Sequence, residues 1–195
     1  MSPVVAMDLA LRRGWLPWFA EMQALLSPWG LHGGGMRHPY ALHFGYAIPC
    51  REVIEVIAAC GPLLEVGAGG GYWASWLRRM GCDVIATDPK VEPYPYGRYE
   101  WTDVLQLDAA EATRRFPGRN ILMVWPRPES TWCIDVVRGM VPGQLLCYVG
   151  AGPFGCCAPP QFFLELYSGG FVVLDHRPCP AWPPNLDYLT VYGKR

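Results

Sequence analysis

Hydrophobic and polar positions follow several different periods along the chain, and each period predicts a kind of element. Helical spacing of the apolar residues predicts helices over residues 15–26, 51–60, 72–80, 108–116, 128–140 and 160–167. Short apolar runs predict strands over residues 63–66, 83–87, 98–105, 120–125 and 145–149, of which 98–105 is the weakest. Residues 170–175 and 186–192 are two β-rich runs with no helix between them, so we expect them to pair antiparallel.

This order of elements predicts an α/β fold. Strands that alternate with helices form right-handed, parallel βαβ units, and the closing pair completes a Rossmann-like, doubly wound, seven-stranded sheet. The sheet is expected to be mostly parallel with a C-terminal antiparallel strand. The helical stretches before residue 60, with a loop over 28–49 rich in glycine, histidine and aromatic residues, predict an N-terminal helical lid over 1–50. At 195 residues, the chain fits one domain over 1–195.

The composition excludes several classes of protein. Hydrophobic residues make up 51% of the chain and charged residues 17%, which excludes a disordered chain. A net charge of -1 provides no basic surface for a phosphate backbone, so we expect no nucleic-acid partner. Residues 139–164 carry no charge, but their four prolines and five glycines argue against a membrane span. The oligomeric state stays open, with a homodimer as one option.

The cysteines predict a reducing compartment. There are eight of them, most lie in apolar stretches, and no Cys-x-x-Cys pair occurs, so a disulfide scaffold is not expected. The apolar run over residues 1–11 precedes Arg12 and Arg13, which is the wrong order for a signal peptide. We therefore expect a cytoplasmic protein. Cys156-Cys157 and His176-x-x-Cys179 do not supply four ligands at a known zinc spacing, so no metal site is expected.

A glycine-rich loop joins the strand at 63–66 to the next helix. Its sequence is Glu65-Val66-Gly67-Ala68-Gly69-Gly70-Gly71-Tyr72. Glycines turn the chain sharply and let a ligand lie against the backbone, and this loop is at the carboxyl end of a strand, where open α/β sheets bind nucleotides. Residues 69–74 also satisfy the pattern G-x-G-x-x-A, so NAD is one candidate ligand.

Charge around the loop favours a cationic ligand instead. Glu65 would repel phosphates, and Tyr72 and Trp73 stand where a pyrophosphate needs open amides. Asp88, at the end of the second strand, can accept both hydroxyls of a ribose. Glu65 can face an ammonium group, the glycines let a ligand chain lie close to the backbone, and Asp88 can bind a ribose. Together these features fit S-adenosylmethionine (SAM). The alternative is that the glycines only form a tight turn and Asp88 caps a helix.

These motifs resemble the class I SAM-dependent methyltransferases. The resemblance is carried by Glu65-x-Gly67-x-Gly69-x-Gly71, by Asp88 and by Val141-Pro142-Gly143 before a strand, and it extends from residue 51 to the C-terminus. Aromatic-rich pieces at 46–49, 71–74, 125–126, 148–150 and 182–192 are similar to a small group of microbial methyltransferase-like proteins. The resemblance implies the fold and SAM as cofactor. The residues expected to bind it are Glu65, Gly67, Ala68, Gly69, Gly71, Tyr72, Trp73, Asp88, Asp103, Val104 and Trp125.

Individual residues in this set have competing roles. Asp103-Val104 follows the third strand, where class I enzymes often read the adenine amino group, while Asp108 competes for that role or caps the next helix. Many amino-group methyltransferases carry Asp/Asn-Pro-Pro-Tyr after the fourth strand, but here the sequence is Trp125-Pro126-Arg127-Pro128, so methylation of a planar amine loses support.

The candidates for catalysis are aromatic side chains and bases. Trp125, Tyr46 and Trp73 are candidates for an aromatic wall beside the sulfonium, although each of them also fits a core position. Candidate bases are His43 and His32 in the lid and Glu129 after the fourth strand. The catalytic candidates are Tyr46, Trp125 and His43.

Three functions follow from this sequence. The first is methyl transfer from SAM to a small, largely apolar acceptor beneath the lid. The second uses SAM itself as substrate, and forms an azetidine or a lactone with release of methylthioadenosine. The third is a non-catalytic SAM-binding protein that stabilises a partner through its uncharged loop at 150–160. Incubation with SAM alone distinguishes the second function from the other two.

Overall fold

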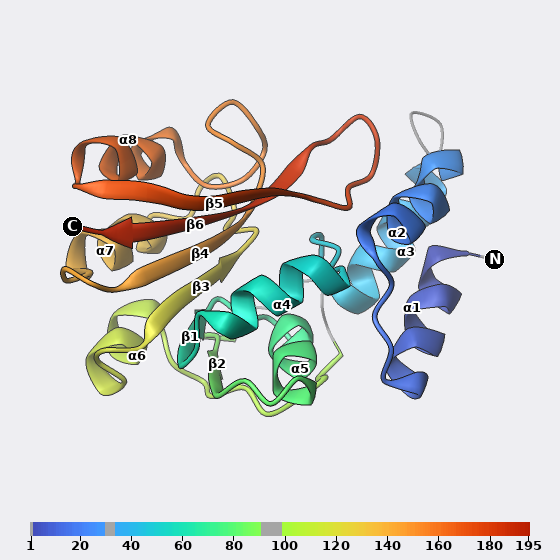
Figure 1. The fold of residues 1–195 in the computed structure, drawn as a ribbon, viewed down its shortest axis with the longest axis horizontal. Helices are drawn as coiled ribbons and strands as arrows, with labels where there is room; N and C mark the ends of the chain where they lie inside the picture. Colours follow the sequence, from blue (N-terminus) through green and yellow to red (C-terminus); the bar gives the residue numbers. More distant parts are fainter. Residues whose placement is uncertain (1, 30–33, 91–98) are drawn as a thin grey trace.

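The computed structural model describes residues 2–29, 34–90 and 99–195, so the candidate base His32 lies outside the described residues. The sheet has six strands: β1 (Leu63–Val66), β2 (Val84–Thr87), β3 (Asn120–Val124), β4 (Leu145–Gly150), β5 (Phe171–Cys179) and β6 (Asp187–Lys194). Their order is β2-β1-β3-β4-β6-β5 (Figure 1). The first four are parallel and β6 lies antiparallel to both β4 and β5, as the sequence pattern predicts.

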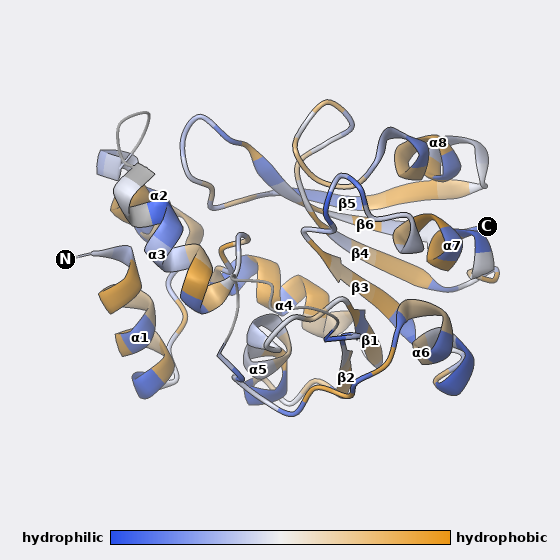
Figure 2. Ribbon diagram, turned by 180° about the vertical axis from the view of Figure 1, so that it is seen from behind, coloured by the Kyte–Doolittle hydropathy of each residue, from blue (hydrophilic) through white to orange (hydrophobic). Residues whose placement is uncertain are grey.

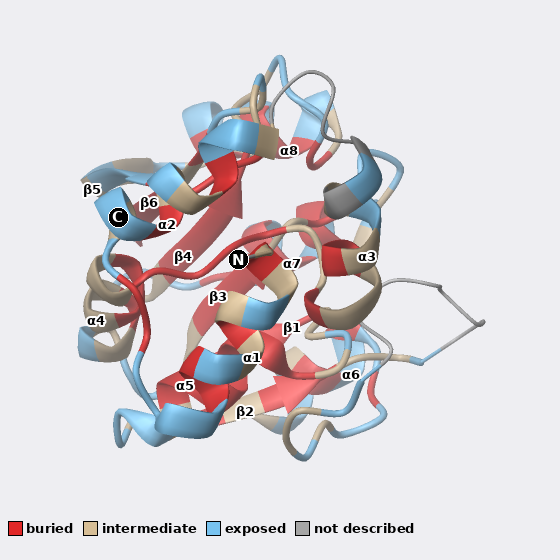
Figure 3. Cartoon of the chain, turned by 90° about the vertical axis from the view of Figure 1, so that its right-hand side faces the viewer, coloured by how far each residue is buried: buried red, intermediate tan, exposed pale blue. Residues whose placement is uncertain are grey.

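Helices cover both faces of this sheet. Buried residues of α4 (Arg51–Ala59) and α5 (Tyr72–Arg79) pack in one core cluster, together with residues of α1 (Pro3–Arg13), α2 (Phe19–Leu26) and α3 (Gly34–Phe44). The other cluster contains residues of α6 (Ala109–Arg115), α7 (Trp132–Gly139) and α8 (Pro160–Ser168). Figure 2 shows the apolar strands β3 and β4 between the helices, and Figure 3 shows that the edge strand β5 is largely exposed.

The expected strand over 98–105 is present only as a single bridge, so the count of seven strands is not confirmed. Leu105 pairs in parallel with Thr87 at the β2 edge. The segment before Leu105 makes other hydrogen bonds. The amide of Trp101 donates to Gly70 O at 2.8 Å, and Arg78 donates to the Thr102 hydroxyl and the Asp103 carbonyl. Residues 101–103 are therefore hydrogen-bonded to the glycine loop and to α5 and do not extend the sheet.

The N-terminal segment is more helical than its sequence pattern indicates. The helix expected over 15–26 begins at Phe19, and α1 precedes it, with Pro3 in its first turn and Gly14 as its C-cap at φ +64°. The 3-10 turn η1 (Ser27–Trp29) follows α2. Helix α3 occupies part of the expected loop over 28–49, because its buried Tyr40 and Phe44 pack on other aromatic rings.

Two hydrogen bonds join the N-terminal segment to the C-terminal hairpin. The side chain of Gln23 on α2 donates to Ala181 O at 3.3 Å and accepts from Ala181 N at 3.1 Å. Trp182, next in the chain, packs its ring edge-on against Tyr40, with 5.7 Å between ring centroids. The N-terminal helices are thus packed against the body of the protein. None of the helices built from described residues is both long enough and apolar enough to traverse a membrane.

Candidate functional site

The glycine loop between β1 and α5 contains three positive-φ glycines with different surroundings. Gly67, Gly69 and Gly71 have φ values of +73°, +55° and +76°. A Cβ on Gly67 would lie 3.0 Å from the Trp132 ring, and one on Gly71 would lie 2.8 Å from methyl groups of Thr102 and Val104. These two glycines are required for packing within the chain. A Cβ on Gly69 would meet no described atom within 4 Å, so Gly69 is the glycine that leaves room for a ligand.

Asp88 joins the end of β2 to this loop. Its Oδ2 accepts from the amide of Gly69 and its Oδ1 accepts from the amide of Lys90, both at 2.9 Å. The residue is half-buried. Each carboxylate oxygen has two lone pairs, so both oxygens retain capacity to accept a hydroxyl. Asp88 is therefore held in place beside the open side of Gly69.

Glu65, at the end of β1, is buried to 2% exposure. Among described residues its Oε2 has no hydrogen-bond partner. Burial raises the pKa of Glu65 to about 8, against the lowering effects of the Ala74 backbone and the Arg78 guanidinium. The carboxyl is thus mostly neutral at pH 7 in the ligand-free protein, and a cation that reaches it would displace a proton.

The residues predicted to contact adenine, Asp103 and Val104, lie in the segment that packs against Gly71. Val104 contacts that glycine position, and the side chain of Asp103 is exposed. Asp108 accepts from the amide of Glu111 at 2.8 Å and is the N-cap of α6. The capping role considered for Asp108 is therefore confirmed.

The aromatic candidates separate into two groups. Tyr72 and Trp73 are buried in the core cluster that contains the N-terminal helices, which agrees with the core role considered for Trp73. Tyr46 and Trp125 form a separate stack, with ring centroids 4.8 Å apart and an interplanar angle of 17°. Trp125 follows β3 directly and has a positive φ of +50°, which turns the chain sharply at that strand end. The structure thus brings together two of the three catalytic candidates.

The candidate bases lie elsewhere. The His43 ring stacks on Tyr99 with centroids 4.7 Å apart, and its Nδ1 lies 2.8 Å from the Pro39 carbonyl, which can only accept. Nδ1 therefore carries the proton. Glu129 is exposed and paired with Arg127, which lowers its pKa. A carboxylate that acts as a general base near physiological pH needs a raised pKa instead.

Sequence reasoning missed Asp187, the first residue of β6. The indole Nε1 of Trp125 donates to Asp187 Oδ2 at 3.0 Å, across a separation of 62 residues. Asp187 is 5% exposed, and Oδ1 has no partner in the described part of the chain. Burial raises its pKa to about 6, opposed by the Trp125 hydrogen bond and by Arg37. No local motif marks this residue, because its partner follows β3, 62 residues earlier in the chain.

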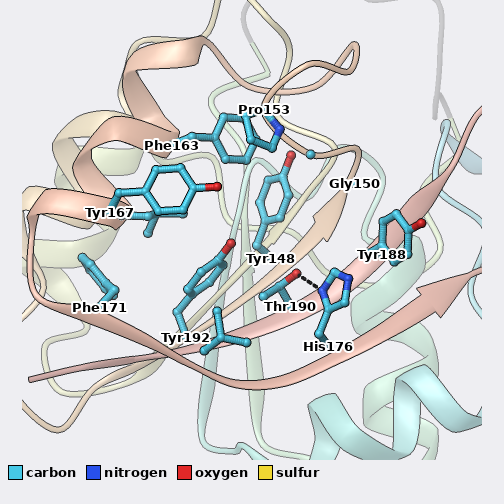
Figure 4. Close-up of a pocket in the computed structure, with 13 residues that line it drawn as sticks. Tyr148, Gly150, Pro153, Phe163, Tyr167, Phe171, His176, Tyr188, Thr190 and Tyr192 are labelled. Carbon is cyan, nitrogen blue, oxygen red and sulfur yellow. Dashed lines mark hydrogen bonds between the residues drawn. The ribbon is translucent and has the colours of Figure 1, made fainter.

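A cavity of about 280 Å³ lies on the opposite face of β6 from Asp187, between α8 and the β5–β6 hairpin (Figure 4). Its lining includes four tyrosines: Tyr148, Tyr167, Tyr188 and Tyr192. His176 stacks on Tyr188 and places Nδ1 2.9 Å from the Thr190 hydroxyl. The eight cysteines are free thiols, and no cluster of three or more ligating side chains occurs in residues 2–29, 34–90 and 99–195.

Comparison with known proteins identifies the fold. No protein-family model and no curated protein sequence matches the chain. Among solved structures, precorrin-6y C5,15-methyltransferase from Geobacter metallireducens GS-15 aligns with a TM-score of 0.52 and 12% identity, over 83% of this chain and 97% of that one. Magnesium protoporphyrin IX methyltransferase from Synechocystis PCC 6803, solved with bound SAM, aligns with a TM-score of 0.51 and 13% identity, over 74% and 77%.

A third solved structure covers a longer protein. TrmN from Thermus thermophilus aligns with a TM-score of 0.51 and 19% identity over 74% of this chain but 48% of its own, so this chain spans about half its length. The chain therefore has the Rossmann-like fold of the class I SAM-dependent methyltransferases.

Proposed function

We propose that this protein is a SAM-dependent methyltransferase that acts on a small molecule. The observation that carries this proposal is the pairing of Asp88 with the amide of Gly69, beside the open side of that glycine. Solved structures of the same fold are methyltransferases, and one of them holds SAM. An unpartnered buried oxygen on Glu65 fits a cationic ligand in the same loop.

The residues suited to hold SAM are those of the β1 and β2 ends. Asp88 would accept the ribose hydroxyls, Glu65 would face the ammonium group, and Asp103-Val104 would border the adenine. When bound, SAM supplies an electrophilic methyl carbon on a positively charged sulfur. The Trp125–Tyr46 stack provides an apolar and π-rich wall at the neighbouring end of β3.

The chain's own contribution to catalysis would be alignment and exclusion of water. A nucleophile held in line near a reacting carbon, in a dry site, gains much of its acceleration from positioning. The helices α1, α2 and α3 share a core cluster with α5, which follows the glycine loop. We therefore place the acceptor between these helices and the ends of the strands. No covalent intermediate on the protein is needed.

The proposal is tested by calorimetric titration with SAM, S-adenosylhomocysteine and NAD. Asp88→Ala should weaken SAM binding by about 10- to 150-fold, since a charge-assisted hydrogen bond contributes roughly 1.5–3 kcal/mol. Asp108→Ala is the matched control, because Asp108 caps α6 and should leave SAM affinity unchanged. Affinity for NAD together with indifference to SAM would refute the proposal.

A second assay separates methyl transfer from cyclisation. Protein incubated with SAM alone should release no methylthioadenosine if an external acceptor is required. Release of methylthioadenosine at a rate that depends on Asp88 would show that SAM itself is the substrate. Binding of SAM without turnover, across a broad panel of small acceptors, would instead support a non-catalytic SAM-binding protein.

A further inference from the structure

Asp187 is a buried carboxylate of which only one oxygen has a hydrogen-bond donor among the described residues. Oδ2 accepts from the indole of Trp125 at 3.0 Å, and Oδ1 has no hydrogen-bond partner among the residues described. A buried carboxylate oxygen without a donor is costly, and a purely structural acid ordinarily has partners for both oxygens. At the exposed Asp83, by comparison, the Arg119 guanidinium donates to both carboxylate oxygens. The arrangement around Asp187 leaves one oxygen for a donor from outside the chain.

The described groups that interact with Asp187 come from several parts of the fold and include one cation. Arg37 on α3 is close enough to lower the pKa of Asp187. Its guanidinium lies over the Tyr46 ring, 5.8 Å from the centroid. With the Asn185 carboxamide oriented so that its oxygen faces Arg37, that oxygen accepts from both terminal guanidinium nitrogens at 3.2 Å. Arg37 is thus directed to Tyr46 and Asn185, and it acts on Asp187 through its charge.

The remaining groups that act on Asp187 are neutral near pH 7. Burial raises the pKa values of Cys157 after β4, Cys179 on β5 and Tyr148 on β4, and the charge of Asp187 raises them further. These thiols and this phenol therefore stay protonated between pH 5 and pH 8. Asp187 is the group of this set that changes charge in that interval.

The aromatic stack next to Asp187 favours a cation. Trp125 holds the carboxylate through its indole edge and presents its ring to Tyr46. Aromatic faces attract ammonium groups, most strongly where the contact is desolvated. A carboxylate that can only accept hydrogen bonds binds donors and repels acids. An alcohol supplies one donor without charge, whereas an ammonium supplies several donors and compensates the buried charge.

We propose that Asp187, Trp125 and Tyr46 form the acceptor site, and that the acceptor is an amine whose nitrogen donates to Asp187 Oδ1. The ammonium would give one proton to Asp187, and the freed nitrogen lone pair would then form the bond to the methyl carbon as the methyl–sulfur bond of SAM breaks and S-adenosylhomocysteine leaves. This inference rests on the proposed function for the role of the amine, but the binding site itself does not depend on SAM. Asp187 is separate from the residues expected to hold the cofactor, whereas Trp125 belongs to both sets. Nucleotide binding and amine binding are therefore measured separately, so that either proposal can fail alone.

The test follows the Trp125 indole N–H resonance in ¹⁵N-labelled protein. That resonance is assigned by its loss in Trp125→Phe, and it reports on Asp187 because the two groups are hydrogen-bonded. The probes are benzylammonium, benzyl alcohol and benzoate, which share one ring and differ in charge, each titrated with and without S-adenosylhomocysteine. The affinity for benzylammonium, obtained from the shift of this resonance, should be at least about 10-fold higher than that for benzyl alcohol, equivalent to about 1.4 kcal/mol. Benzoate should not shift the resonance.

The variant Asp187→Asn keeps an oxygen for the Trp125 indole and removes the charge. It should reduce benzylammonium affinity to that of benzyl alcohol while S-adenosylhomocysteine affinity stays unchanged. Asp175→Asn, in an exposed pair with Arg177 on the neighbouring strand, is the matched control and should change neither affinity. Equal affinities for benzylammonium and benzyl alcohol, or no loss in Asp187→Asn, would overturn the amine site. Loss of nucleotide binding with intact benzylammonium binding would refute only the proposed function.

A pH titration gives a second readout. In the wild-type protein the Trp125 resonance should titrate with a midpoint near the Asp187 pKa of about 6, and benzylammonium binding should weaken below that pH as the carboxylate is protonated. In Asp187→Asn both pH dependences should disappear. A benzylammonium affinity that is constant from pH 5 to pH 8 in the wild-type protein would contradict the inference.

Discussion

Two buried carboxylates, Glu65 at the end of β1 and Asp187 at the start of β6, differ in a way that matters for ligand binding. Each has one oxygen without a partner in the described residues. The pKa of Glu65 is raised to about 8, so at pH 7 it is mostly protonated. Burial raises the pKa of Asp187 to about 6, opposed by the Trp125 indole and Arg37, so at pH 7 it is mostly ionised. Similar burial thus gives one mostly neutral group and one charge.

The same pKa shifts predict how stability depends on pH. Each group binds its proton more tightly in the folded than in the unfolded chain, so each contributes stability that is fully present below its unfolded pKa. This contribution is lost as pH rises through about 6 for Asp187 and through about 8 for Glu65. The two regions can therefore be perturbed separately.

The largest expected effect is at the glycine loop. Gly69→Val places a branched side chain in the open space and at an unfavourable φ, so SAM binding should fall at least about 100-fold, equivalent to about 2.8 kcal/mol. Gly118→Val is the matched control, since Gly118 also has a positive φ and an unobstructed Cβ direction in the described structure. Calorimetry measures the affinity. A folded Gly69→Val protein that binds SAM normally would show that the loop is only a turn.

The next effect concerns the hydrogen bond between Trp125 and Asp187. Trp125→Phe removes the indole donor and leaves Asp187 without a hydrogen-bond donor among the described residues, which should destabilise the protein by about 1.5–3 kcal/mol at pH 8. The loss should be smaller at pH 5, where Asp187 is mostly protonated. Urea unfolding at both pH values measures it. In the Asp187→Asn background the pH dependence of the loss should disappear, and an equal loss at both pH values in both backgrounds would contradict this account.

The smallest expected effect is the release of a proton from Glu65 when SAM binds. If the ammonium group of SAM reaches Glu65, binding at pH 7 should release close to one proton, because the carboxyl is mostly protonated beforehand. Titration in two buffers with different enthalpies of ionisation measures this number. Glu65→Gln should release none. Binding without proton release in the wild-type protein would mean that Glu65 supports the loop and does not meet the ligand.

Local patterns were sufficient to predict the glycine-loop region. Glu65, the glycines and Asp88 lie within a short stretch of chain, and their places in the fold follow from strand ends and from φ values that only glycine adopts readily, while their roles toward a ligand stay predictions. The apolar runs of β1, β3 and β4 are buried on both faces and stand out in the sequence for that reason. Asp108 was ambiguous between two roles, and the structure assigns it to the cap.

The region around Asp187 could not be predicted in the same way. Its hydrogen bond to Trp125 depends on how β6 is aligned against β4, which no short motif encodes. The expected third strand failed for a related reason, because Trp101 makes tertiary hydrogen bonds to the glycine loop. Helix α3 was missed because its glycines and Pro39 indicate a loop, and burial of Tyr40 outweighs them.

The reciprocal hydrogen bonds between Gln23 and Ala181 have a consequence for the amine site. Residue 181 lies six positions before Asp187, on the connection that leads into β6, and its backbone is anchored to a helix 158 residues away. A change at Gln23, remote from any reacting atom, would therefore alter where the carboxylate sits. Selectivity for an amine at Asp187 would therefore depend on residues from both the N-terminal helices and the C-terminal hairpin.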